Sequence, residues 1–213
     1  MMTAFKGSLF PPATWKSCDT SGFPESPYPG TRPVGSWRLT PTGNLHGLQH
    51  CVDGWVDRCS GQVISVADRH LVLGYGSNLN PSKLVSKYGG EEVFVLRSAV
   101  VGWAAAWCNA RRSQGDVVAT VVPAPGHVEV HGVIAVTREQ LQEMDRWEGH
   151  PQYYERQRFA GTVLLENGET ASPEVYLGSP GKRPPLLLGG QPALCSEISH
   201  DVVERLVPEG SRS

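Results

Sequence analysis

Five consecutive residues have the composition of a ligand-binding turn: Tyr75-Gly76-Ser77-Asn78-Leu79. They follow the apolar run Leu71-Val72-Leu73, which predicts a short buried strand, and they precede Asn80 and Pro81, which predict a helix start. Glycine allows close approach to the backbone, and successive N–H groups before a helix can hold a negatively charged oxygen. The turn lacks the ending of a phosphate loop and the third glycine of a dinucleotide site. It is a candidate oxyanion site, with a plain turn as the alternative.

A second candidate is Glu148, at the end of a helix predicted to begin after Thr137. Thr137 and Gln140 form a capping box, and Gly149 ends the helix. The negative end of the helix dipole and the apolar side chain of Trp147 both disfavour an ionised carboxyl at this position. Such a carboxyl suits a general base that works near neutral pH. A solvated glutamate at a frayed helix end is the alternative.

Several motifs, taken in order, resemble the γ-glutamylcyclotransferase superfamily. They are Tyr75-Gly76-Ser77-Asn78-Leu79, the segment from Ala119 to Gly126, His131-Gly132-Val133, Met144-Asp145-Arg146-Trp147-Glu148-Gly149, Tyr154-Glu155-Arg156 and Val175-Tyr176. The resemblance covers roughly residues 69–176, about half of the chain. It implies an α+β fold built on a small mixed β-barrel with a few short helices.

The resemblance also implies a reaction without a cofactor. The substrate would be a small molecule with a γ-glutamyl group, whose α-amine attacks its own γ-carbonyl and releases 5-oxoproline and an amine or amino acid. Glu148 would accept the ammonium proton, the turn Tyr75 to Leu79 would bind the glutamyl end, and Tyr154 would reach the substrate.

Two alternatives stay open at this point. The first is a related enzyme that removes a γ-glutamyl protecting group from a biosynthetic intermediate. The second is a non-catalytic ligand-binding module on the same fold. The joint presence of the turn and Glu148 argues against a module, which would not need the acid.

Composition narrows the class of protein further. The chain has 213 residues, of which 39% are hydrophobic, which fits one globular domain with an extension. A net charge of -2 gives no electrostatic case for binding nucleic acid or an anionic membrane. No segment approaches the roughly 20 apolar residues of a membrane span, and the N-terminus lacks the pattern of a secretory signal. Five scattered cysteines fit a reducing compartment, so a cytoplasmic location is expected.

The composition changes near residue 66, which predicts an irregular N-terminal arm over residues 1–66 and a catalytic domain over residues 67–213. Prolines recur in the arm among glycine, serine and threonine and discourage regular structure. The arm also carries aromatic residues that need burial, namely Trp15, Phe23, Tyr28, Trp37 and Trp55. We expect it to pack on the barrel and border the site, with a purely stabilising wrap as the alternative.

Local patterns predict the remaining elements. Strands over residues 115–122 and 128–136 are expected to form a hairpin through Pro125-Gly126. Strands over residues 156–165 and 172–177 are expected to pair around Asn167-Gly168, and a short helix spans residues 200–206.

Other groups of reactive residues point to no further chemistry. The order of the possible zinc ligands fits no zinc module, so no metal is expected at His46, His50, Cys51 and Cys59. Cys108 ends an apolar run and is expected to be a buried structural thiol. Arg111-Arg112 could clamp a substrate carboxylate, but a solvated turn is favoured.

Overall fold

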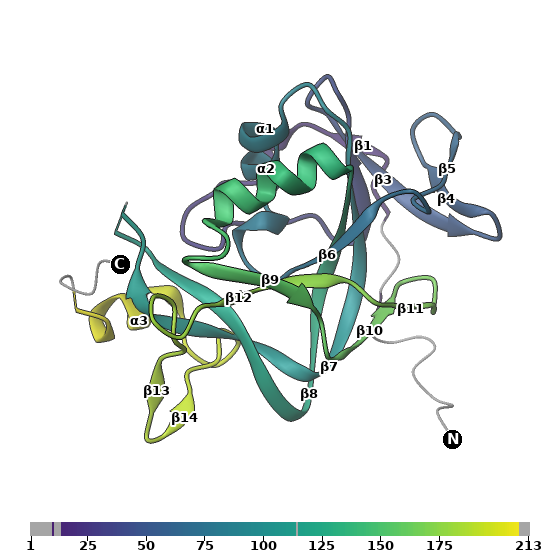
Figure 1. Ribbon diagram of the computed structural model, residues 1–213. Coiled ribbons are helices and arrows are strands. Elements are labelled where there is room, and N and C mark those ends of the chain that lie inside the picture. The colour runs from purple at the N-terminus through teal and green to yellow at the C-terminus, as the bar shows by residue number, and fades with distance from the viewer. Residues whose placement is uncertain (1–9, 11–13, 114, 209–213) are drawn as a thin grey trace.

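Two long antiparallel strands form the centre of the fold in the computed structural model, which describes Phe10, residues 14–113 and residues 115–208 (Figure 1). They are β7 (Val93–Arg111) and β8 (Val117–Val136). Both are rich in valine and alanine and are buried over much of their length, as expected for strands covered on both faces. Their register pairs Phe94 with Ala135 at one end and Arg111 with Val117 at the other.

The predicted hairpin through Pro125-Gly126 is wrong, because both of its predicted strands belong to β8. Val128 pairs with Val101, and Pro123 pairs with Trp103, so β8 has three more residues than β7 between these two pairs. Gly126 at φ 87° provides a left-handed conformation within this bulge. A bulge bends a strand and increases its twist without ending it. Gly126 therefore has a turn conformation, as the sequence predicts, but the turn lies within one strand and does not connect two strands of a hairpin.

The other strands extend the sheet on both sides of this pair. β8 is followed by β6, β12 and β9 in spatial order, and β12 runs parallel to β6. Their bounds are His70–Gly74 for β6, Glu174–Gly178 for β12 and Tyr154–Arg158 for β9. β7 also pairs with β10 (Thr162–Leu165), which pairs with β11 (Thr170–Ala171).

The predicted pairing around Asn167-Gly168 is confirmed, although each partner is divided into two shorter strands. Gly168 has φ 87°, and its N–H donates to the carbonyl of Leu165 at 2.9 Å. The predicted strand over residues 156–165 divides into β9 and β10. β10 pairs with β11 next to the turn, and β9 pairs with β12, with Arg156 opposite Tyr176.

Part of the predicted irregular arm is regular. Its strands are β1 (Ser17–Cys18), β2 (Ser36–Leu39), β3 (Leu45–Cys51), β4 (Gly54–Asp57) and β5 (Val63–Ile64). β2 pairs with β7, so β2 to β5 form a meander that continues the main sheet. The prolines fall outside these strands, and Trp37 and Trp55 are buried within them. Residues 1–9 and 11–13 of the arm lie outside the described residues, and a boundary at residue 66 stays a prediction.

The main sheet is open, which corrects the expected barrel. Its spatial order runs from β5 to β9, and these two edge strands do not pair among the described residues. The α+β class is confirmed. The sheet bends strongly through β7 and β8 instead of closing (Figure 1). A separate small hairpin is formed by β13 (Leu187–Leu188) and β14 (Gln191–Pro192).

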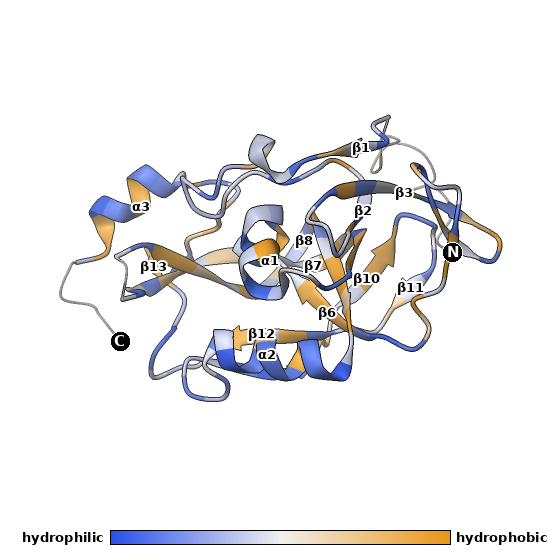
Figure 2. Ribbon diagram, turned by 90° about the horizontal axis from the view of Figure 1, so that it is seen from above, coloured by the Kyte–Doolittle hydropathy of each residue, from blue (hydrophilic) through white to orange (hydrophobic). Residues whose placement is uncertain are grey.

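Three α-helices accompany the sheet in the described part of the chain. They are α1 (Pro81–Tyr88), α2 (Arg138–Glu148) and α3 (His200–Leu206). Most of α2 is hydrophilic in Figure 2, and its buried Leu141 and Met144 join Leu84 and Tyr88 of α1 in the core. None of the helices that the structure describes is both long and apolar enough to cross a membrane.

The predicted helix ends are confirmed. Asn80 accepts a hydrogen bond from the Lys83 N–H at the start of α1, and Thr137 and Gln140 form the capping box of α2. Gly149 ends α2 in the left-handed conformation at φ 62°. These caps fix where α2 stops and therefore where the Glu148 side chain can reach.

A buried ion cluster ties β2, β3 and β4 together. The Asp57 side chain is 0% exposed, and its Oδ2 lies 2.8 Å from His46 Nδ1 and 2.5 Å from Arg38 Nη2. Its Oδ1 accepts from the N–H groups of Cys59 and Ser60 at 2.7 and 3.1 Å. Burial would raise the pKa of Asp57, but these hydrogen bonds and the guanidinium outweigh it and lower the pKa to about 2.

Candidate functional site

A cavity of about 500 Å³ lies between the turn after β6 and the C-terminal end of α2. The predicted residues that line it are Tyr75, Gly76, Ser77, Asn78, Glu148 and Tyr154. Leu79 is the exception: it is 2% exposed, and its Cδ2 fills the space where side chains at Gly74 and Gly132 would stand. Leu79 therefore anchors the turn to the core instead of lining the cavity.

Glu148 is held by two side chains that enter from the other wall. The Asn78 Nδ2 donates to Glu148 Oε1 at 2.8 Å, and the Lys87 Nζ lies 3.5 Å from the same oxygen. Lys87 also donates to Asn78 Oδ1 at 2.6 Å. The three residues thus form a closed triangle of polar contacts at the edge of the cavity.

Lys87 was not found from the sequence. It lies in the last turn of α1, which carries it back beside Asn78. The spacing of Lys83 and Lys87 is a usable signal, because residues four apart share one face of a helix, and both line the cavity.

The surroundings of Glu148 differ from the expected apolar wall. Trp147 is 53% exposed, and the Lys87 ammonium lies 5.7 Å from the centre of its indole ring. Lys87 and Asn78 therefore hold the Glu148 carboxyl group through one oxygen at the edge of the cavity.

The backbone of the turn offers hydrogen-bond donors to the cavity. The N–H groups of Leu79 and Asn80 donate back to the carbonyls of Gly76 and Ser77, at 3.2 and 3.0 Å. The N–H groups of Gly76, Ser77 and Asn78 have no acceptor within the described part of the chain. Open N–H groups at the start of a helical turn form an anion site.

The space around position 76, and not its backbone conformation, requires glycine, because a φ of -122° suits any residue. A Cβ at this position would lie 2.5 Å from the hydroxyl oxygen of Tyr28. Tyr28 belongs to the N-terminal segment and lines this cavity, so the segment borders the candidate site.

Three tyrosines shape the cavity wall through bonds to the backbone. Tyr75 donates to the carbonyl of Tyr176 at 2.5 Å, and Tyr154 donates to the carbonyl of Ala119 at 3.0 Å. Tyr28 accepts from the N–H of Ala119 at 3.2 Å. Burial raises the pKa of all three hydroxyls, so they stay protonated at neutral pH and serve as fixed walls.

Cationic side chains outnumber acidic ones around the cavity, and all of them except Arg183 lie beside a carboxylate among the described residues. Glu148 is the one acidic residue among the described lining residues, whereas the cationic ones are Lys83, Lys87, Arg112, Arg146 and Arg183. Arg183 is buried, donates to the carbonyl of Arg111 at 2.9 Å, and has an Nε without a partner among the described residues. Arg111 itself is bound to Glu204 and lies outside the lining, so of the predicted arginine pair only Arg112 faces the cavity.

The four residues considered as zinc ligands, His46, His50, Cys51 and Cys59, do not form a group close enough to bind one ion in the described part of the chain. His46 is paired with Asp57, and His50 lies edge-on to the Trp55 ring. The one group of three potential ligands within the described residues is Asp116, His200 and Glu204. Arg112 pairs with Asp116 and Arg111 pairs with Glu204, so both carboxylates already have cationic partners.

The chain matches the family model of γ-glutamyl cyclotransferase, AIG2-like, over residues 72–191. This match spans more than half of the chain, and the protein therefore belongs to that family. The matched segment contains the turn, Glu148 and Tyr154. A search of curated proteins found no match.

Solved structures with a similar chain path include three from eukaryotes. An uncharacterized human protein is 19% identical, with a TM-score of 0.45 over 53% of this chain and 68% of its own. An AIG2-like protein from mouse is 16% identical, with a TM-score of 0.41 over 52% of this chain and 78% of its own. A yeast γ-glutamyl cyclotransferase specific to glutathione is 17% identical, with a TM-score of 0.38 over 53% and 70%.

Proposed function

We propose that this protein cyclises the γ-glutamyl group of a small molecule and releases 5-oxoproline together with an amine or amino acid. The observation that supports this most strongly is the shared cavity, which sets the Glu148 carboxylate opposite the open N–H groups of the turn. Membership of the γ-glutamyl cyclotransferase family agrees with this assignment.

The proposed reaction needs one proton acceptor and one oxyanion site. Glu148 takes a proton from the substrate's α-ammonium, and the freed amine attacks the γ-carbonyl carbon to close a five-membered ring. The carbonyl oxygen becomes an oxyanion and is stabilised by the N–H groups of Ser77 and Asn78. Glu148 then gives the proton to the leaving nitrogen, the bond from that nitrogen to the γ-carbon breaks as the carbonyl re-forms, and the ring nitrogen loses its extra proton to the departing amine.

These residues are sufficient because the nucleophile and the electrophile are in one molecule. Holding the glutamyl chain in a folded conformation contributes several kcal/mol at most, on the order of what oriented intramolecular reactions gain. One well-placed N–H donor adds roughly 3 kcal/mol. Lys87 and Asn78 hold one oxygen of Glu148 in place, and Arg183 provides a positive partner for the substrate's α-carboxylate.

The direct test is a screen for 5-oxoproline release from γ-glutamyl amino acids and γ-glutamyl amines. The matched controls are the α-glutamyl isomers, in which the amine cannot reach a γ-amide to form the ring. We expect release from γ-isomers alone, with a chelator present or absent. Binding of γ-glutamyl compounds without any release would favour a non-catalytic module instead.

The same screen separates the related alternative, removal of a γ-glutamyl protecting group from a biosynthetic intermediate. That function predicts turnover only for γ-glutamyl compounds with a large leaving group, and no turnover of γ-glutamyl amino acids. The cavity extends beyond the turn to Arg112, Ser113 and Arg183, so it has room for a leaving group of either kind.

A further inference from the structure

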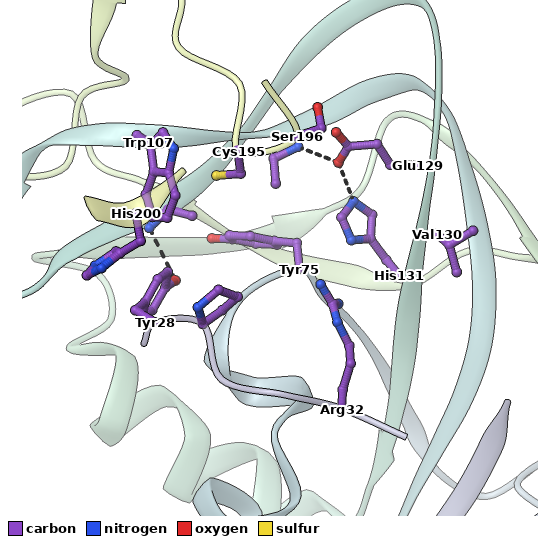
Figure 3. A pocket seen from close by; sticks show the side chains of 13 residues that line it. Tyr28, Arg32, Tyr75, Trp107, Glu129, Val130, His131, Cys195, Ser196 and His200 are labelled. Carbon is purple, nitrogen blue, oxygen red and sulfur yellow. Dashed lines mark hydrogen bonds and ion pairs between the residues drawn. The ribbon is translucent and has the colours of Figure 1, made fainter. Parts of the chain in front are cut away.

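A second cavity, of about 380 Å³, adjoins the first one (Figure 3). Tyr28, Tyr75 and Ala119 line both cavities and form the partition between them. On the far side of this partition the lining comes from the N-terminal segment, from β7 and β8, and from the segment before α3. The residues that matter there are Arg32, Ala105, Trp107, Glu129, His131 and Cys195.

Glu129 supplies an unpaired acceptor in this cavity. Its Oε2 accepts from the Ala105 N–H at 2.9 Å and lies 3.1 Å from His131 Nε2. Its Oε1 is buried and makes no hydrogen bond of normal geometry within the described residues, although the Ser196 side chain lies beside Glu129 (Figure 3). Burial opposes ionisation, but the contacts with His131, Ala105 and Ser196 outweigh it and lower the pKa of Glu129, so it is a carboxylate at neutral pH.

His131 is buried beside it with a side chain that is 3% exposed. Its Nδ1 has no hydrogen-bond partner in the described chain. Burial lowers the pKa of His131 despite the adjacent carboxylate, so the imidazole is neutral and does not cancel the charge of Glu129. A buried imidazole nitrogen and a buried carboxylate oxygen without partners are costly unless a ligand or water satisfies them.

Arg32 supplies the opposite charge. Although the residue as a whole is exposed, its guanidinium points into the cavity beside Tyr75 and His131 (Figure 3). It makes no ion pair with any described residue, Glu129 included. Desolvation lowers the pKa of Arg32 but leaves an arginine charged at neutral pH.

We infer that this second cavity binds an α-amino acid group, with its ammonium at Glu129 and its carboxylate at Arg32. A simple anion would meet the Glu129 carboxylate, and a simple amine would leave the guanidinium unpaired. A zwitterion satisfies both, and Ala105 and Trp107 offer apolar surface to its side chain. Cys195 adds no nucleophile, because burial raises the pKa of its thiol.

The α-amino acid group in this cavity could come from two sources. One is a free amino acid. The other is the leaving part of a substrate whose glutamyl end occupies the first cavity, and this second source rests on the proposed function.

Binding is tested by calorimetry on the full chain with L-alanine and L-methionine as probes. Ethylamine and propionate are the matched controls, since each lacks one of the two charges. We expect the amino acids to bind at least tenfold more tightly than either control. Arg32→Gln and Glu129→Gln should each weaken that binding at least tenfold, and Glu148→Gln, in the first cavity, should leave it unchanged.

Thermal melts establish that the variants are folded, and Arg32→Gln keeps the test valid if Glu129→Gln fails to fold. The absence of saturable binding of either amino acid at millimolar concentrations would overturn the inference. So would binding that survives Arg32→Gln but is lost in Glu148→Gln.

The source is identified by comparing γ-glutamyl-alanine with γ-glutamyl-ethylamide in wild type and Arg32→Gln. If the leaving part sits in the second cavity, the variant raises KM at least tenfold for γ-glutamyl-alanine only. Unchanged KM values for both, with L-alanine binding lost, assign the site to a free amino acid. If neither compound is turned over, the proposed function is wrong, but the calorimetric binding measurements still test the inference.

Discussion

Asp57 in the N-terminal meander and Glu148 at the end of α2 are both carboxylates with a cationic partner, but only one of them is open. Asp57 is fully buried, and both of its oxygens accept hydrogen bonds or pair with a cation. Glu148 has partners at Oε1 alone among the described residues, and it lines a cavity. A closed carboxylate stabilises a fold, whereas a carboxylate with one oxygen open to a cavity is available for proton transfer.

Glu148→Gln should produce the largest effect of those considered. The amide cannot accept the ammonium proton, so turnover should fall by about 10²–10⁴, the usual contribution of a general base. The measurement is 5-oxoproline release, with thermal melts to show that the fold is kept. Glu143→Gln is the control, because Glu143 lies on the same helix, pairs with Arg146 and is not in the cavity lining. A loss below tenfold in Glu148→Gln would reject its role as the base.

Asp57→Asn should lower stability and leave turnover unchanged, which is the reverse of the effect of Glu148→Gln. The substitution breaks a buried ion pair and leaves Arg38 with Glu92 as its one carboxylate partner among the described residues. Breaking such a pair costs about 3–5 kcal/mol of unfolding free energy. Urea denaturation measures the loss, and 5-oxoproline release per folded molecule should stay near the wild-type value. If Asp57→Asn were as stable as wild type but inactive, the distinction between a closed and an open carboxylate would be wrong.

Gly76→Ala tests the contact between the turn and the N-terminal segment. The added methyl group would press on the Tyr28 hydroxyl, and overpacking of this kind costs about 1–3 kcal/mol. We expect the affinity for the γ-glutamyl compound and the turnover to fall together, by roughly tenfold for each 1.4 kcal/mol.

Tyr28→Phe should partly restore the Gly76→Ala variant. Without the hydroxyl, the methyl group faces the ring carbon Cζ at 3.5 Å, which is an ordinary contact. Equal losses in the double variant and in Gly76→Ala alone would show that the two residues do not meet in solution.

Acid should reveal the smallest effect, and comparison with Asp57→Asn isolates the part that Asp57 contributes. Its folded pKa of about 2 lies below the ordinary value near 3.9, so its stabilisation is complete above about pH 4 and is lost as the pH falls toward 2. The difference corresponds to about 2 kcal/mol. Urea denaturation at about pH 4, 3 and 2 should show a steeper loss in wild type than in Asp57→Asn. Parallel losses in the two proteins would contradict the assignment.

The sequence predicts the helix ends around the candidate site, because those ends depend on local chemistry. The caps at Asn80 and at Thr137 with Gln140 depend on residues within one turn, and both are present. The stop at Gly149 fixed the end of α2 in the same way. The meeting of the turn with Glu148 needed the family resemblance, since no local rule brings residues 70 positions apart together.

The features that the sequence missed depend on tertiary partners. Pro125-Gly126 has the composition of a hairpin turn, but pairing with β7 on both sides makes it a bulge. The prolines of the N-terminal segment concealed β2 to β5, whose buried faces match the edge of β7. Tyr28 reaches the cavity through packing of the N-terminal segment, which no spacing in the sequence specifies. The spacing of Lys83 and Lys87 places both on one face of α1, but only the packing of α1 turns that face toward the cavity.

The most direct test of the account is a crystal structure of Glu148→Gln with a γ-glutamyl amino acid bound. We predict the γ-carbonyl oxygen at the N–H groups of Ser77 and Asn78, and the α-amine within about 3.2 Å of the side chain at position 148. A glutamyl group bound elsewhere, or an α-amine out of reach of that side chain, would contradict the central claim that the turn and Glu148 form one catalytic site.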